Sequence, residues 1–115
     1  MTIGIGIDIV EVERIEKLIS TKENFLLRNF TNSEIEYFSQ SKSIRAETVA
    51  GNFAAKEAFA KALGTGFRGF NLCDIEVLRN ELGAPYINFR KERTKTQVSI
   101  SHTKTTAVAV VIISE

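Results

Sequence analysis

The stretch GIGIDIVEV, residues 4–12, begins with a strict alternation between two kinds of position. Isoleucine stands at every odd position from 3 to 9, and Gly4, Gly6 and Asp8 lie between them. This period of two predicts a β-strand with one apolar face. The opposite face is bare at two glycines, and glycine within a strand often marks the close approach of a ligand or of another backbone. If that face is buried, the carboxylate of Asp8 has to be hydrogen-bonded, ion-paired or bound to a metal.

A second stretch, GNFAAKEAFAKALG at residues 51–64, lies in the longest predicted helix. From about Ile44 to Leu63 there is no proline, and the abundant alanine favours helix. Gly64 stands where a C-terminal cap glycine belongs. Three shorter helical segments are expected before it: one that starts near residues 11–13, an apolar turn at Phe25–Phe30, and a helix after the capping box Thr31–Glu34.

The second half of the chain is rich in strand patterns. The expected strands are 73–79, 85–89, 98–103 and 106–113, and a tight turn at Lys104 and Thr105 joins the last two. The order of strand, helices and then strands predicts an α+β fold with an antiparallel strand meander packed on a long helix. With 115 residues, we expect a single domain over 1–115.

The composition excludes several classes of protein. Fifteen Lys and Arg balance fourteen Asp and Glu, so no field of one sign attracts nucleic acid or an anionic membrane. The longest apolar run, 107–113, is far shorter than the ~20 residues of a membrane span, and the N-terminus has no signal-peptide pattern. The single cysteine, Cys73, allows neither an internal disulfide nor a zinc cluster. We therefore expect a soluble protein of a reducing compartment, the cytoplasm.

Charged residues flank the apolar stripe of the long helix. Phe53 lies at the centre of the stripe, Glu57 borders it, and Lys61 follows at i+4. From spacing alone, Glu57 and Lys61 could equally form an ordinary surface pair. Lys56, on the other flank, is expected to bury its stem and leave its ammonium group in water.

The remaining candidates each have a plain structural explanation beside the functional one. His102, the only histidine, shares a strand face with Val98 and Ile100, whereas Ser101 faces the other way, which argues against a Ser/His/Asp hydrolase. The Gly64-Thr-Gly66 loop could offer backbone N–H groups to a phosphate, or simply cap the helix. Arg14, at the start of the first helix, could recognise an acidic partner or be solvated.

Several motifs occur together in order. They are GIGIDIVEVERI at 4–15, FTNSEIEYF at 30–38, FAAKEAFAKALGTG at 53–66, DIEV at 74–77, G-x-P at 83–85 and SISHT at 99–103. Together they resemble the holo-acyl carrier protein synthases, the small type of 4′-phosphopantetheinyl transferase. The likeness runs from Ile3 to about Ile113. One departure is Asn52, where the family commonly has arginine.

The resemblance implies an enzyme that moves 4′-phosphopantetheine from coenzyme A to a serine of apo acyl carrier protein. It further implies release of adenosine 3′,5′-bisphosphate, a role in fatty acid biosynthesis, and a homotrimer with active sites between subunits. Asp8 and Glu57 would bind Mg²⁺, Lys61 would act on the phosphates, and Arg14 would bind the carrier. The implied coenzyme A-binding residues are Arg45, Asn52, Phe53, Lys61, Gly64, Pro85 and His102.

Two other classes of function remain open at this point. One is a coenzyme A- or nucleotide-binding module without catalysis, and the retention of Asp8, Glu57 and Lys61 together weighs against it. The other is a purely structural oligomer module, which leaves Asp8 and Glu57 unexplained. Two carboxylates facing each other repel unless a divalent cation or a shared proton lies between them.

Overall fold

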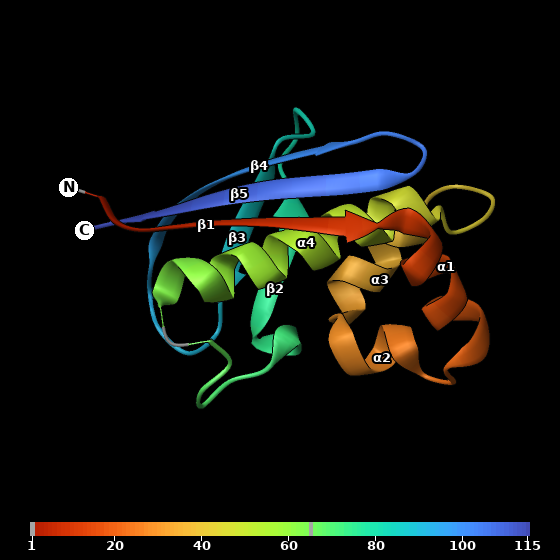
Figure 1. The fold of residues 1–115 in the computed structure, drawn as a ribbon, viewed down its shortest axis with the longest axis horizontal. Coiled ribbons are helices and arrows are strands. Elements are labelled where there is room, and N and C mark those ends of the chain that lie inside the picture. The colour runs from red at the N-terminus through yellow and green to blue at the C-terminus, as the bar shows by residue number, and fades with distance from the viewer. Residues whose placement is uncertain (1, 65) are drawn as a thin grey trace.

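The computed structural model describes residues 2–64 and 66–115, and its elements follow the predicted order (Figure 1). A strand is followed by helices and then by further strands. The elements are β1 (Thr2–Glu11), α1 (Val12–Thr21), α2 (Phe25–Asn29), α3 (Asn32–Phe38), α4 (Ala46–Leu63), the 3₁₀ turn η1 (Leu72–Asp74), β2 (Ile75–Arg79), β3 (Pro85–Phe89), β4 (Lys95–His102) and β5 (Thr106–Ser114). The α+β class is confirmed. None of the helices in the described residues is long and apolar enough to cross a membrane.

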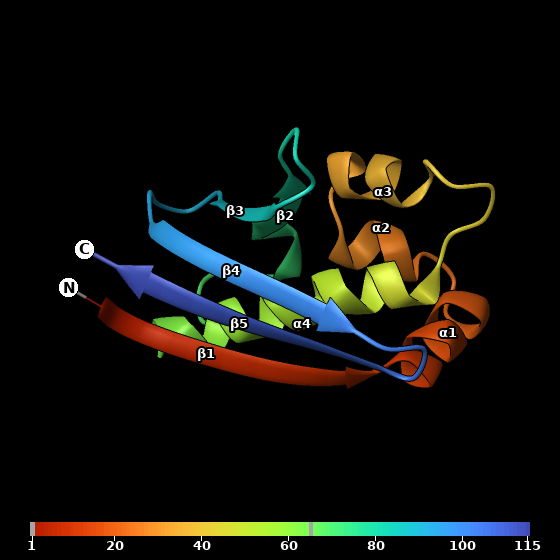
Figure 2. The same ribbon diagram turned by 90° about the horizontal axis from the view of Figure 1, so that it is seen from above.

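The strands form two antiparallel sheets rather than one. The first has the order β1-β5-β4, and the second pairs β2 with β3. Figure 2 shows β1 and β4 at opposite edges of the three-stranded sheet, with β5 between them and α4 beneath. The register pairs Asp8 with Ala109, and Ala109 with Ile100. Asp8, Ala109 and Ile100 therefore lie side by side across the sheet, from the β1 edge to the β4 edge.

The two glycines of β1 let α4 lie directly against the strand. A Cβ atom at Gly4 would lie 1.9 Å from the carbonyl oxygen of Ala62, and one at Gly6 would lie 1.9 Å from that of Ala58. Both distances are far inside van der Waals contact, so neither position tolerates a side chain without movement. The bare face predicted from the sequence accommodates another backbone, and it brings Asp8 next to the C-terminal half of α4.

The other face of β1 is exposed. Ile3, Ile5, Ile7 and Ile9 retain 59%, 65%, 61% and 67% of their accessible surface. Partly exposed apolar residues of β5 continue this outer face, because Ile5, Ile7 and Ile9 pair with Ile112, Val110 and Val108. Exposed apolar areas of this kind mark interaction surfaces in soluble proteins.

The helices begin and end where the sequence predicts, with small differences. Thr31 and Glu34 form the capping box at the start of α3, with each side chain accepting from the other residue's backbone N–H. Gly64 ends α4 in the left-handed conformation, with φ of 79°. Two strands start elsewhere than predicted: residues 72–74 form a 3₁₀ turn before β2, and β4 starts at Lys95 instead of residue 98.

The expected position of Lys56 is wrong. Its ammonium group is fully buried, lies 2.6 Å from a carboxylate oxygen of Glu34, and donates to the carbonyl oxygens of Asn29 and Leu72. Helix α4 contacts the three-stranded sheet and also contacts α1 and β2, so the flank that carries Lys56 is covered. This buried ion pair joins α3 to α4.

Candidate functional site

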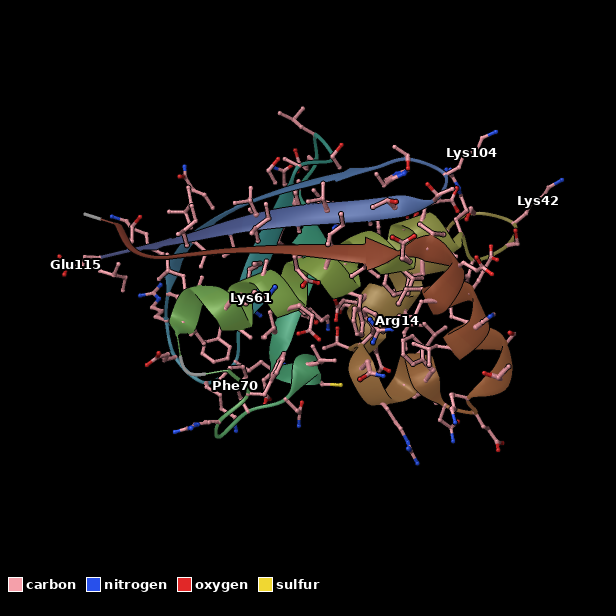
Figure 3. The ribbon with its side chains drawn as sticks, in the orientation of Figure 1. Arg14, Lys42, Lys61, Phe70, Lys104 and Glu115 are labelled. Atoms are coloured by element: carbon pink, nitrogen blue, oxygen red, sulfur yellow. The ribbon has the colours of Figure 1, made fainter. Side chains whose placement is uncertain are left out.

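Asp8, Glu57 and Lys61 converge at the contact between β1 and α4. The ammonium group of Lys61 lies 3.0 Å from Oδ1 of Asp8 and donates to the carbonyl oxygen of Ile7, also at 3.0 Å. In Figure 3 Lys61 lies on α4 alongside β1. The side chain of Asp8 is mostly buried, whereas that of Lys61 is exposed. The predicted requirement that a buried Asp8 be paired is therefore confirmed.

The two carboxylates of this cluster affect each other electrostatically. Partial burial raises the pKa of Glu57, and the negative charge of Asp8 raises it further. The nearby positive charges of Arg14 and Lys61 oppose this effect and lower the pKa. A carboxylate with a raised pKa beside a second carboxylate indicates a place where a cation is favoured.

Arg14 lies next to this cluster. Its guanidinium carbon is 5.6 Å from the ring centroid of Phe53, within the range of a cation–π contact. Phe53 is buried and stacks on Phe25, with ring centroids 6.2 Å apart. Arg14 itself is exposed, and Figure 3 shows where it lies beside α1. The side chain therefore presents positive charge at the rim of the acidic cluster.

His102 and Pro85 belong to a different place, at the β4 edge. Both line a cavity of about 220 Å³ between α4, β4 and the second sheet, which we call the β4 cavity. Gly51 and Arg79 also line it. Arg45, at the N-cap of α4, is exposed and pairs at 3.2 Å with Glu47, another residue of the cavity wall.

The structure does not place Asn52 with these surface residues. Its side chain is fully buried and donates to Oε2 of Glu34 and to the carbonyl oxygen of Val77. The amide of Asn52 joins α3, α4 and β2, and its assignment to a nucleotide site stays a prediction. Phe53 is likewise buried, whereas Gly64 is exposed at the end of α4. Thr65 of the glycine loop lies outside the described residues.

The acidic cluster has the composition of a magnesium site. No group of three or more His, Cys, Asp and Glu side chains in residues 2–64 and 66–115 is arranged to hold a metal ion. Mg²⁺, however, is commonly held by one or two carboxylates together with substrate phosphates and water. Asp8 and Glu57 fit this pattern, and their mutual repulsion gives a divalent cation a favourable place.

Sequence reasoning missed two features of these sites. It paired Lys61 with Glu57 as one alternative, whereas Lys61 contacts Asp8, because β1 crosses the helix at the two glycines. It also overlooked Arg79, which reaches the β4 cavity from the end of β2. The alternation of β2 gave a signal for this position, since residues 75, 77 and 79 share one face.

Known proteins are similar to this chain over nearly its whole length. The sequence model of the 4′-phosphopantetheinyl transferase superfamily matches residues 4–113. The holo-[acyl-carrier-protein] synthase of Clostridium botulinum (strain Alaska E43 / Type E3) is 54% identical over 118 residues, which cover 96% of this chain and 95% of that protein. The enzyme of the same name from Fusobacterium nucleatum is 46% identical and covers 98% of this chain and 99% of its own.

Solved structures agree with these sequence matches. A holo-(acyl-carrier-protein) synthase from Bacillus anthracis, in complex with CoA (3′,5′-ADP), superposes with a TM-score of 0.88 at 42% identity and covers 98% of this chain and 96% of its own. The Helicobacter pylori enzyme in complex with coenzyme A gives 0.84 at 37% identity, with 96% and 99% covered. The chain therefore belongs to the 4′-phosphopantetheinyl transferase superfamily, among its holo-[acyl-carrier-protein] synthases.

Proposed function

We propose that this chain transfers 4′-phosphopantetheine from coenzyme A to a serine of an apo acyl carrier protein, depends on Mg²⁺ and releases adenosine 3′,5′-bisphosphate. The observation that carries the proposal is the convergence of Asp8, Glu57 and Lys61 at one exposed edge of the β1–α4 contact. Two carboxylates can hold a divalent cation, and this cation and the ammonium group can together offset the negative charge of a reacting pyrophosphate. Relatives that carry this name across nearly the whole chain support the same reaction.

Each residue of the cluster has a role in this reaction. Asp8 and Glu57 would hold the Mg²⁺ ion, which when bound neutralises charge on the coenzyme A pyrophosphate. Lys61, whose side chain is exposed, can turn its ammonium group toward the phosphate oxygens and stabilise the charge that develops there. The carrier serine attacks the β-phosphorus and the bond to the 3′,5′-ADP oxygen breaks. The serine proton passes to a carboxylate or a water molecule of the site.

The carrier protein is proposed to dock beside Arg14. This side chain is exposed, lies over the ring of Phe53 and is close enough to Glu57 to affect its pKa. A positive group at the rim of a site steers an acidic partner and sets its orientation. The product, a carrier with its phosphopantetheine arm, serves fatty acid biosynthesis in this proposal. The free thiol of Cys73 is consistent with the reducing cytoplasm as the place of action.

We further propose that the active site is completed between copies in a homotrimer. Asp8 lies on one edge strand of the sheet and His102 on the other, with β5 between them. The two residue sets that the resemblance assigns to one substrate therefore lie at opposite edges of a single chain. The exposed isoleucines of β1 supply an apolar face for a second copy, and a neighbour seated there can bring its β4 cavity toward Asp8.

One experiment tests the transfer directly. The protein is mixed with apo carrier protein, coenzyme A and Mg²⁺, and the carrier is weighed by mass spectrometry. The expected result is a gain equal to one phosphopantetheine arm, which is lost in EDTA and in Asp8→Ala. If no gain occurs with any of several carriers, while coenzyme A still binds, the chain is a coenzyme A-binding module instead of an enzyme.

The proposed assembly has its own test. Ile7→Lys places a charge in the centre of the exposed face without touching α4. The comparison variant Ser99→Lys places the same charge on β4, the opposite edge strand, where polar residues already face outward. Light scattering is expected to give three copies for the wild type and fewer for Ile7→Lys. A trimer that persists in Ile7→Lys would contradict this interface.

A further inference from the structure

Lys61 and a divalent cation would use the same carboxylate of the acidic cluster. The ammonium nitrogen of Lys61 lies 3.0 Å from Oδ1 of Asp8 and 3.0 Å from the carbonyl oxygen of Ile7. A Mg²⁺ ion binds carboxylate oxygens at about 2.0–2.1 Å and carries twice the charge of the ammonium group. An ion bound to this oxygen would lie next to Lys61 and repel it, so the two cations compete for Asp8.

Lys61 is the partner of this ion pair that can move. Its side chain retains 57% of its accessible surface, whereas that of Asp8 retains 17%. Asp8 is fixed by β1, whose backbone lies directly against α4 at Gly4 and Gly6 (Figure 3 shows Lys61 alongside this strand). Water can replace the exposed ammonium group at the carbonyl oxygen of Ile7. Access to Asp8 therefore depends on the position of Lys61.

The charges of the cluster are balanced when Lys61 is paired. Asp8 and Glu57 carry two negative charges, and the positive charges of Arg14 and Lys61 act on Glu57. With Lys61 seated on Asp8, the attraction of the cluster for a further cation is weakened. A pyrophosphate changes this balance in two ways. It offers oxygen ligands to a divalent cation, and it draws the ammonium group of Lys61 toward its own negative charge.

We propose that Lys61 competes with the divalent cation for Asp8 and releases this carboxylate when the pyrophosphate of coenzyme A arrives, so that metal and coenzyme A bind cooperatively. This inference rests on the proposed function, because it takes coenzyme A as the substrate. The coupling is reciprocal, so metal and coenzyme A raise each other's affinity by the same factor. A site that is open in about a tenth of the molecules binds its ligand ~10-fold more weakly than an open one. Lys61 therefore disfavours metal binding until the substrate is present.

The test measures metal binding without the reaction. Mn²⁺, which like Mg²⁺ prefers carboxylate and water ligands, is titrated into the full-length protein without coenzyme A, and electron paramagnetic resonance measures the free ion. Lys61→Met should bind Mn²⁺ ~10-fold more tightly than the wild type, because the competing ammonium group is gone. The matched control is Arg14→Met, which removes the other positive charge that acts on Glu57 but leaves Lys61 on Asp8. It should tighten Mn²⁺ binding far less than Lys61→Met does.

Addition of coenzyme A measures the coupling itself. In the wild type it should raise the affinity for Mn²⁺ by at least ~5-fold, after correction for the Mn²⁺ that coenzyme A binds in a titration without protein. In Lys61→Met this increase should be smaller, since the competition has already been removed. If Lys61→Met binds Mn²⁺ no more tightly than the wild type, or if Arg14→Met gains as much as Lys61→Met, the inference is overturned.

A second variant keeps the test decisive if Lys61→Met does not fold. Lys61→Gln can still donate to the carbonyl oxygen of Ile7 but carries no charge, so it should also bind Mn²⁺ more tightly than the wild type. The titrations need no carrier, so they separate this inference from the transfer reaction. A protein that couples metal and coenzyme A through Lys61 but never modifies a carrier would retain the role of Lys61 and lose the proposed function. A protein that modifies its carrier while its metal affinity is independent of Lys61 would do the reverse.

Discussion

Replacing Gly6 with alanine should damage both the fold and the site, because the added methyl group meets the backbone of α4. The new Cβ would lie 1.9 Å from the carbonyl oxygen of Ala58 and 2.8 Å from the amide nitrogen of Ala62, whereas ordinary contact begins at 3.4 Å. Strand and helix must therefore separate locally by about 1.5 Å. Overpacking in a core costs ~1–3 kcal/mol when side chains can adjust. Here the obstacle is hydrogen-bonded helix backbone, so we expect about 3 kcal/mol or more, a large part of the ~5–15 kcal/mol typical of a domain.

The matched control is Gly51→Ala on the same helix. Its Cβ would meet the Cγ2 atom of Ile100 at 2.9 Å, a side-chain atom that can move. Alanine within a helix gains ~1 kcal/mol over glycine, so the net change should stay within about 1 kcal/mol. Urea unfolding followed by circular dichroism should show a midpoint about 1–3 M lower for Gly6→Ala and nearly unchanged for Gly51→Ala. A Gly6→Ala midpoint equal to that of the wild type would refute the close contact between β1 and α4.

Three further changes test the electrostatic account. Lys56→Met should lower the free energy of unfolding in urea by ~3–5 kcal/mol, because it leaves the carboxylate of Glu34 buried without its partner. An unfolding midpoint equal to that of the wild type would contradict this. The pKa of Glu57 is raised from 4.5 in the folded protein, so ionisation of Glu57 lowers the free energy of unfolding as pH rises from 4.5 through the raised value. In EDTA, Glu57→Gln should therefore unfold at a higher urea concentration than the wild type at about pH 7, and this difference should vanish toward about pH 4. Arg14→Glu should raise KM for the carrier more than KM for coenzyme A, and the wild-type affinity for the carrier should fall with salt; equal effects on the two substrates would place Arg14 inside the catalytic pocket instead.

The sequence predicted the elements well because their signals are local. The alternation at residues 3–9, the capping box at Thr31 and the cap at Gly64 each depend on neighbours within a few positions, and all three are confirmed. The two glycines of β1 also predicted correctly that another backbone lies close to this face of the strand. These features result from short-range sterics and hydrogen bonding, which a single sequence records directly.

The errors arose where distant segments decide the environment. Lys56 was expected to reach water, but its partner Glu34 lies 22 positions away and closes that flank of α4. The burial of Asn52, through contacts with Glu34 and with Val77, 25 positions away, was likewise not foreseen, although its predicted role is untested. A helical wheel gives the angle of a residue but not what covers that angle. For the same reason, the order β1-β5-β4, which separates Asp8 from His102, did not follow from the order of strands along the chain.

The most direct test of the central claim, a transferase site shared between copies, is complementation between two disabled variants. Asp8→Ala loses the acidic cluster and His102→Ala loses a wall of the β4 cavity, so each alone should transfer little phosphopantetheine. The two are unfolded and refolded together in equal amounts, and native mass spectrometry verifies that mixed trimers form. If each site takes its cluster from one chain and its cavity from a neighbour, about a quarter of the sites in random trimers are intact. We therefore predict transfer at about a quarter of the wild-type rate per chain, whereas mixed trimers no more active than the separate variants would contradict the shared site.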